Sequence, residues 1–329
     1  MVSFFKFIIG ASYRNLTIIK NLSQIFTLAG VHAIDVGADP EVVKAAKEGI
    51  RLALPVKFPL LMISVGLNND VHFMKVKKSN EKCVLCGKCI DICQNKVFKV
   101  LNSKIQISDD KCVGCKKCIS VCEPQCLKFV PIKSTFTDIE NCIKEGADAI
   151  EIHCGDGKIK AIKSMWKKIS IYIQSKEEIA LPISSNSSPL MGEDKGEGEI
   201  KAVSFSIGAH GLTTAKIISL IAEIKKFVNE PVIWQIDGCP ISGKKGREST
   251  LPSLMLAKEI RKVYPDIFLQ VSGGVNNLTY TLAKEENISI DGIGMGSFAR
   301  AYLNIDDMEN MDYETLMQAA KKARELIDF

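Results

Sequence analysis

Two runs of four closely spaced cysteines constrain this 329-residue chain more than any other feature of its sequence. Both runs have the spacing C-x2-C-x2-C-x3-C, and the second begins nineteen residues after the first ends. Spacers of two residues let a tight loop place three thiolates around one iron–sulfur cube. Zinc sites built from thiolates alone use pairs of CxxC, so the triplets favour iron. The runs consist of Cys83, Cys86, Cys89 and Cys93, and of Cys112, Cys115, Cys118 and Cys122.

The spacing predicts two [4Fe–4S] clusters, because in this motif the fourth cysteine of each run reaches the other cube. Gly87 and Gly114 lie inside the runs and supply the backbone freedom that tight wrapping requires. Proline usually follows the fourth cysteine, whereas Gln94 and Glu123 follow it here and constrain the backbone less. Residues 80–128 resemble a bacterial-type two-cluster ferredoxin. The predicted ligand sets are Cys83, Cys86, Cys89 and Cys122 for one cluster, and Cys112, Cys115, Cys118 and Cys93 for the second.

The twelve cysteines also bear on the compartment. The apolar N-terminal run contains Lys6 and no small-residue cleavage site follows it, so it indicates a strand and not a signal peptide. Twelve cysteines in a chain without an export signal predict a reducing, cytoplasmic location. The longest apolar runs are too short to span a bilayer. The cysteines without ligand spacing are expected to be buried, inert thiols, and they are Cys126, Cys142, Cys154 and Cys239. Of these, Cys154 and Cys239 lie at the ends of predicted strands.

The positive charge of the chain is local. Residues 75–133 hold thirteen Lys and five Asp or Glu, or +8, whereas the whole chain carries +5. Two oxidised clusters with four thiolates each would contribute about −2 apiece and cancel about half of that excess. No aromatic residues alternate with the lysines to form a stacking platform, so nucleic-acid binding is not expected.

Outside the cysteine block, short apolar strands alternate with amphipathic helices, which indicates a parallel sheet. Eight such units in ~270 residues fit a closed, TIM-like (β/α)8 barrel of the α/β class better than an open doubly wound sheet. The helix after the sixth strand is predicted to begin at Leu251, and a final helix spans 313–327. The predicted strands lie at 6–12, 32–39, 59–66, up to about 153, and at 202–208, 231–238, 267–275 and 291–297.

Two segments interrupt the predicted barrel. Residues 1–69 form its first part with three strands, residues 70–133 form an inserted two-cluster ferredoxin module, and residues 134–329 form the remainder. Residues 183–200 are rich in serine, glycine and charge, and we expect a flexible insertion there. Because the module follows a strand, it is expected at the carboxyl-end face of the barrel, where active sites lie.

Glycines end the last two predicted strands. Gly273 and Gly274 follow the seventh strand, and Gly296 and Ser297 follow the eighth. These two loops commonly hold a phosphate in (β/α)8 barrels, through backbone N–H groups that glycine leaves open to close approach. Tight turns alone are the alternative explanation. A phosphate bound here would belong to FMN or to a phosphorylated substrate.

Polar residues at other strand ends face the same mouth. The candidates for acid, base or orienting roles are Asp35, His153 and Asp237, with Ser206 and His210 nearby. Turn or helix-cap roles are the alternative for each. The sequence contains no Ser/His/Asp triad pattern and no HExxH motif, so hydrolytic chemistry is not indicated.

Over nearly its whole length, apart from 183–200, the chain resembles the light-dependent period protein A family, iron–sulfur proteins associated with redox input to the cyanobacterial clock. The resemblance implies two iron–sulfur clusters, sensitivity to the cellular redox state and to quinone, and membership of regulatory complexes. It implies no particular enzymatic activity. The segments that carry it are residues 8–50, the two cysteine runs, VIWQIDGCPISG at 232–243 and VSGGVN at 271–276.

Two functional interpretations follow. The first is an electron-transfer or redox-sensing protein with two [4Fe–4S] clusters, redox partner proteins, and a barrel that binds a small phosphorylated ligand. The second is an FMN-dependent oxidoreductase in which the clusters relay electrons to flavin, by analogy with flavin dehydrogenases that carry fused two-cluster ferredoxins. The lack of a lysine at a predicted strand end to contact the flavin weighs against the second. A barrel that acts mainly as a scaffold for partner proteins is a third interpretation.

Overall fold

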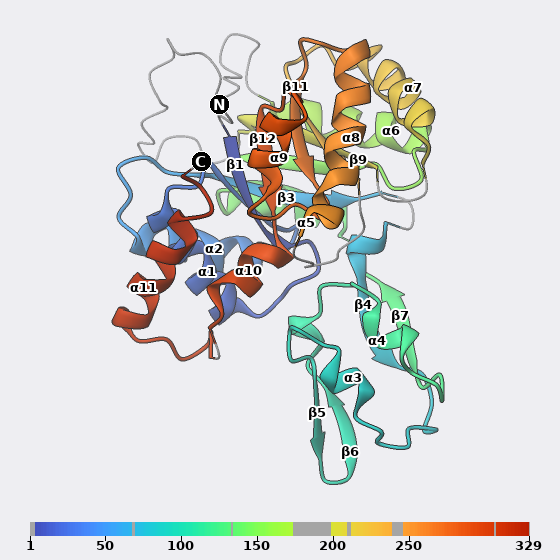
Figure 1. Ribbon diagram of the computed structural model, residues 1–329, viewed down its shortest axis with the longest axis vertical. Helices are drawn as coiled ribbons and strands as arrows, with labels where there is room; N and C mark the ends of the chain where they lie inside the picture. Colours follow the sequence, from blue (N-terminus) through green and yellow to red (C-terminus); the bar gives the residue numbers. More distant parts are fainter. Residues whose placement is uncertain are drawn as a thin grey trace.

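Eight parallel strands close into a barrel in the computed structural model, and helices surround it (Figure 1). The order around the ring is β1-β12-β11-β10-β9-β8-β3-β2, and β1 pairs with both β12 and β2 to complete it. The predicted (β/α)8 fold class is therefore confirmed. The barrel strands are β1 (Phe4–Gly10), β2 (Ala33–Gly37), β3 (Leu60–Gly66), β8 (Ala149–His153), β9 (Ala202–Gly208), β10 (Ile233–Asp237), β11 (Phe268–Ser272) and β12 (Gly292–Met295).

The structure describes residues 4–67, 70–132, 134–173, 199–208, 212–238, 246–305 and 307–328. The insertion expected at 183–200 lies outside the described residues except for its last two. One of these, Ile200, forms a parallel bridge with Ile173. His210 and Cys239 also lie outside the described residues.

Local sequence signals begin and end the helices that cover the barrel. Asn15 caps α1 by accepting a hydrogen bond from the N–H of Ile18, and α1 ends at Gly30 with φ of 89°. Asp39 caps α2, and Pro40 occupies the first position, where a helix has no use for an amide donor. No helix in the described ranges is long and apolar enough to cross a membrane. The helices are α1 (Leu16–Ala29), α2 (Pro40–Leu52), α5 (Phe136–Lys144), α6 (Ile159–Ile169) with η3 (Ser170–Tyr172), α7 (Thr214–Lys225), α8 (Arg247–Val263), α9 (Thr279–Glu285), α10 (Ser297–Leu303) and α11 (Tyr313–Arg324).

Side chains along each barrel strand alternate between two environments. The outward-facing ones, such as Phe7, Ile152 and Trp234, are apolar and pack beneath the helices. The inward-facing ones change character along the strand, from an apolar layer near the amino ends to polar side chains towards the carboxyl ends. The barrel interior is therefore closed by apolar packing at one end and polar at the other. The apolar layer consists of Phe4, Ala33, Met62, Ala149, Ala202, Ile233 and Phe268.

Between β3 and β8 the chain leaves the barrel and forms a small unit with its own apolar cluster. Strands β4 and β7 pair in antiparallel fashion, and β5 and β6 form a hairpin at the end remote from the barrel (Figure 1). We call this unit the cysteine module. Its elements are η1 (Val71–Phe73), β4 (Met74–Lys78), α3 (Lys88–Asp91), β5 (Phe98–Leu101), β6 (Lys104–Ile107), η2 (Asp109–Lys111), α4 (Lys117–Ser120) and β7 (Leu127–Pro131).

The loop before the second cysteine run joins the module to the barrel. The backbone N–H of Arg14 donates to the carbonyl of Asp110 at 2.7 Å, and the hydroxyl of Ser12 donates to the carbonyl of Cys112 at 3.1 Å. Val113 is buried within the main apolar core of the barrel. The second run is therefore held directly against the end of β1.

Candidate cluster sites and barrel cavity

Two cavities in the cysteine module separate the eight clustered cysteines into two groups of four. We call the first cavity the outer cluster site. Leu85 and Gly87 have positive φ values of 55° and 78°, which turn the backbone sharply between consecutive cysteines. Apolar side chains such as Leu127 complete the wall. The donor set and the wrapped loop fit a [4Fe–4S] cube. The cysteines lining this cavity are Cys83, Cys86, Cys89 and Cys122, together with Cys126.

We call the second cavity the inner cluster site, and it repeats the same local geometry. Gly114 and Lys116 have positive φ values of 73° and 62°. Burial, and next the neighbouring thiols, raise the pKa of Cys118 to about 12. Coordination to a metal deprotonates a thiol outright, so iron would remove this penalty. The cysteines lining the cavity are Cys93, Cys112, Cys115 and Cys118.

These groupings coincide with the ligand sets predicted from the spacing, in which the fourth cysteine of each run joins the other group. They support that assignment, which stays a prediction until iron is counted in cysteine variants. Of the cysteines expected to be inert, Cys126, Cys142 and Cys154 are buried. Cys126 differs from the other two because its Sγ lies 3.4 Å from the Sγ of Cys122.

A third cavity, of about 90 Å³, lies at the carboxyl ends of the barrel strands. Ser206 lies beside it and donates its hydroxyl to Asp237 at 2.6 Å. Gly273 and Gly274 have φ values of 63° and 84°, so their backbone conformation alone requires glycine. The structure thus brings the barrel candidates together without assigning a role to any of them. Those that line the cavity are Asp35, His153, Asp237, Gly273, Gly274, Gly296 and Ser297.

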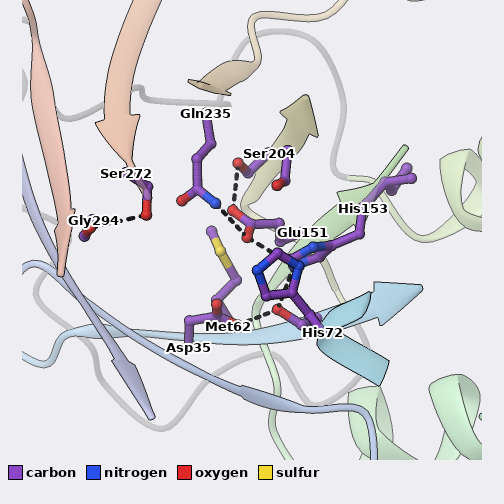
Figure 2. A network of polar contacts seen from close by, with 12 residues as sticks. Asp35, Met62, His72, Glu151, His153, Ser204, Gln235, Ser272 and Gly294 are labelled. Carbon is purple, nitrogen blue, oxygen red and sulfur yellow. Dashed lines mark hydrogen bonds and ion pairs between the residues drawn. The ribbon is translucent and has the colours of Figure 1, made fainter. Parts of the chain in front are cut away.

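A buried ion pair lies inside the barrel, and Figure 2 shows one of its partners, Glu151, among neighbouring polar side chains. Lys6 of β1 pairs with Glu151 of β8, and both side chains are fully shielded from solvent. Glu151 also accepts from the hydroxyl of Ser204 at 2.8 Å and from the amide of Gln235 at 3.0 Å. Burial by itself raises the pKa of Glu151, but Lys6 and His153 outweigh it and hold that pKa below its usual range. Glu151 is therefore an ionised carboxylate, and Lys6, Ser204 and Gln235 on other barrel strands hold it in place.

His153 connects this ion pair to the cavity mouth. Its Nε2 lies 3.1 Å from Oε1 of Glu151 and 3.2 Å from Oγ of Ser64. Its Nδ1 lies 3.5 Å from Oδ2 of Asp70, in the loop after β3. Burial lowers the pKa of His153, but the carboxylates of Asp70 and Glu151 beside its ring outweigh burial and raise it well above its ordinary value. Asp35 accepts from Ser64 at 2.7 Å, and burial, followed by the charge of Glu151, raises the pKa of Asp35 to about 7.

Arg300 of α10 lines the barrel cavity, and its Nη1 donates to the carbonyls of Ile8 and Ile9 at 2.8 and 2.6 Å. Its Nε is shielded from solvent and makes no hydrogen bond within the described residues. Burial lowers the pKa of Arg300, opposed by Tyr13 and Cys115. A guanidinium in this setting can bind an anion.

The sequence interpretation missed several polar groups of this site. A detectable signal existed for part of them, because Glu151 precedes His153 by two residues and Gln235 precedes Asp237 by two, the period of inward-facing strand positions. No periodic signal marks Arg300, which reaches the cavity from a seven-residue helix. The missed residues are Lys6, Ser64, Asp70, His72, Glu151, Gln235 and Arg300.

Comparisons with known proteins agree with both parts of the chain. Residues 75–123 match a 4Fe-4S dicluster domain, so the module is an iron–sulfur domain with a redox role. Two solved structures resemble the fold, the YdjI aldolase from Escherichia coli K12 and a truncated 3-deoxy-D-arabino-heptulosonate 7-phosphate synthase from Thermotoga maritima. Their identities are 8% and 11% and their TM-scores are 0.43 and 0.45; they cover 98% and 99% of this chain and 87% of each of theirs. Likenesses this distant have no bearing on function.

A protein of Synechococcus elongatus described as "Light dependent period A" is 27% identical, over 91% of this chain and 80% of its own length. Residues 142–328, more than half of the chain, match the C-terminal domain of that family. The predicted resemblance is confirmed, and the chain belongs to the light dependent period A family.

Proposed function

We propose that this protein transfers electrons between two [4Fe–4S] clusters and a small phosphorylated ligand bound in the barrel cavity. Val113 is the observation that carries the proposal. It lies between Cys112 and Cys115, and its side chain lines both the inner cluster site and the barrel cavity. One residue therefore separates the space for the inner cube from the space for the ligand.

The order of the electron path follows from exposure. Cys86 of the outer cluster site is exposed, whereas Cys112 and Cys118 of the inner site are buried. A redox partner protein would therefore exchange electrons with the outer cube, and the inner cube would exchange them with the ligand. The module keeps an excess of positive charge after both clusters are counted, so the partner surface is expected to be acidic.

The anionic character of the ligand follows from Arg300 and the loop after β11. Arg300 brings a positive charge to the cavity wall, and Gly273 and Gly274 expose backbone there without a Cβ. A phosphate is the anion that such loops hold most often in barrels of this type. Arginine is well suited to it because its planar donors match phosphate oxygens.

The test is an anaerobic redox titration of the iron–sulfur protein, followed by electron paramagnetic resonance, with and without inorganic phosphate or FMN. Ligand binding should shift the midpoint potential of one cluster, the inner one, and leave the other unchanged. Arg300→Gln should abolish the shift, Arg300→Lys should retain part of it because the charge remains, and Arg51→Gln on the exposed end of α2 should behave as wild type.

Each outcome discriminates. One FMN retained per chain would favour the flavin-dependent oxidoreductase, with flavin as the phosphorylated ligand. A shift with phosphate alone would favour a smaller ligand. If neither probe shifts either potential, the proposal that the barrel binds a phosphorylated electron-transfer partner is wrong.

A further inference from the structure

We propose that Asp70, His72 and His153 form a binding site for a divalent transition-metal ion at the mouth of the barrel. Asp70 and His153 are buried and His72 is half-buried. One ligand atom from each of the three side chains lies within 4.8 Å of the others. The site is separate from both cluster sites and does not depend on the function proposed above.

The three residues come from different parts of the fold. His153 ends β8, while Asp70 and His72 belong to the turn that leads from β3 into the cysteine module. Asp70 Oδ1 lies 2.8 Å from His72 Nδ1, and Asp70 Oδ2 lies 3.5 Å from His153 Nδ1. Donor atoms on one metal with bonds of about 2.1 Å lie at most about 4.2 Å apart. His72 is the most exposed of the three. If its side chain moved by less than about 1 Å, all three donor atoms would come close enough to bind one metal ion.

The carboxylates on both sides of His153 favour a cation at its Nδ1. The Nε2 lies 3.1 Å from Oε1 of Glu151, the ion-pair partner of Lys6, so this nitrogen is placed to donate to Glu151. The Nδ1 is shielded from solvent and makes no hydrogen bond within the described residues, and a second carboxylate, that of Asp70, lies 3.5 Å from it. With a carboxylate on each side of the ring, Nδ1 is favoured to carry a positive charge, which either a proton or a metal ion can supply. A metal ion between Nδ1 and Asp70 would take the place of that proton.

The surroundings of His153 have the form that metal-binding histidines usually have. Such histidines donate their second N–H to a carboxylate, which fixes the ring and raises its basicity. Glu151 occupies that position here. Ser204 and Gln235 donate hydrogen bonds to it (Figure 2), and Lys6 forms an ion pair with it. The orienting group is therefore built and buried before any ion arrives.

The donor set selects the class of ion. Two imidazoles and one carboxylate suit Mn²⁺, Fe²⁺, Co²⁺ or Zn²⁺, whereas Ca²⁺ and Mg²⁺ prefer oxygen ligands. His72 and His153 both line the barrel cavity, so coordination positions not used by protein would face it. Water or an oxygen atom of an anionic ligand would fill them.

The test uses Mn²⁺, which prefers oxygen and nitrogen donors and leaves thiolate-bound iron in place. The cluster-loaded protein, first treated with a chelator, is titrated with Mn²⁺, and the electron paramagnetic resonance signal of unbound Mn²⁺ is followed. One ion per chain should bind. His72→Gln should weaken binding at least about tenfold, and Glu151→Gln about 10- to 100-fold through the loss of the orienting carboxylate. His32→Gln is the matched control, because His32 precedes β2 at the opposite end of the barrel.

Iron content and circular dichroism of each variant show whether it has folded with its clusters. Because His72 is partly exposed, its variant remains informative if Glu151→Gln fails to fold. If Mn²⁺ does not bind, or binds equally well to the His72 variant, these residues form only a proton-linked ion-pair cluster and the proposal is wrong. A chelator added to the redox titration with phosphate or FMN keeps the result of that experiment independent of this one.

Discussion

At the scale of single residues, two buried carboxylates within one barrel have opposite protonation behaviour. Burial and the charge of Glu151 raise the pKa of Asp35 to about 7. Glu151 experiences the same burial, yet Lys6 and His153 hold its pKa below the usual range. Carboxylates whose environments separate their pKa values can serve as acid and as fixed charge in one site. Asp35 is therefore the carboxyl group of this cavity that is suited to exchange a proton near neutral pH.

Asp35→Asn should change how stability depends on pH. The folded-state pKa of Asp35 lies above that of the unfolded chain, so its stabilising contribution is complete below about pH 4 and is lost as the pH rises through about 7. Asparagine has no such titration. The free energy of unfolding of the variant, relative to wild type, should therefore increase by on the order of 2 kcal/mol between pH 5 and 8. Anaerobic urea unfolding followed by circular dichroism measures it.

The control is Asp266→Asn, which changes an exposed aspartate before β11. Parallel pH profiles for Asp35→Asn and wild type would show that the carboxyl of Asp35 titrates normally.

Cys89→Ser should remove about four of about eight irons per chain, because only the outer cube loses a ligand. Cys142→Ser is the matched control, since Cys142 is fully buried in α5 away from both cluster sites. Iron and acid-labile sulfide analysis of anaerobically purified protein gives the answer. A Cys89 variant that keeps all its iron would show that the ligand assignment is wrong.

At the scale of elements, periodic and capped segments were predictable and short or irregular ones were not. All eight barrel strands were predicted, because apolar runs bounded by turn residues are a strong signal. Helix α8 begins at Arg247 instead of the expected Leu251, and Pro252 lies inside it. The four polar residues 247–250, which carry no apolar periodicity, form its first turn. Helix α10 was not predicted, since its seven residues are too few for a periodic pattern.

The same contrast holds for the candidate site. Cysteine spacing is a one-dimensional signal, and it predicted two groups of four that coincide with the two cavities of the module. The strand-end residues could also be predicted from the sequence, because parallel strands share one carboxyl-end edge. Arg300 and Asp70 could not be predicted, since their places depend on how α10 and the turn after β3 pack against the barrel.

Removal of iron should loosen the strand pair β4–β7 and leave the barrel intact. The apolar cluster of the module contains Cys112, Cys118 and the partly buried Cys83, so cube formation and packing are coupled there. The barrel has a continuous core of its own. Hydrogen exchange by mass spectrometry, with and without clusters, should show faster exchange in residues 74–78 and 127–131 and unchanged protection in β2 and β10. Equal protection of the module in both states would contradict this coupling.

At the scale of the whole molecule, the chain places a basic, cysteine-rich module at the polar end of a closed barrel. The contacts that join the two parts involve the second cysteine run, through Ser12, Arg14 and Val113. The β5–β6 hairpin lies farther from the barrel (Figure 1). Ile105 of this hairpin lines the outer cluster site. Exchange with partner proteins and binding of a ligand would therefore take place at opposite ends of one path, and neither would obstruct the other.

The side chain of Val113 lines both the inner cluster site and the barrel cavity, so loss of the inner cube would also disturb the wall of that cavity. If oxidation destroyed the inner cube, the loop that carries Val113 would unwind, and the barrel cavity would lose part of its wall. Oxygen damage would then interrupt electron transfer and release a bound ligand in one event. The protein would not retain a ligand that its clusters could no longer reach.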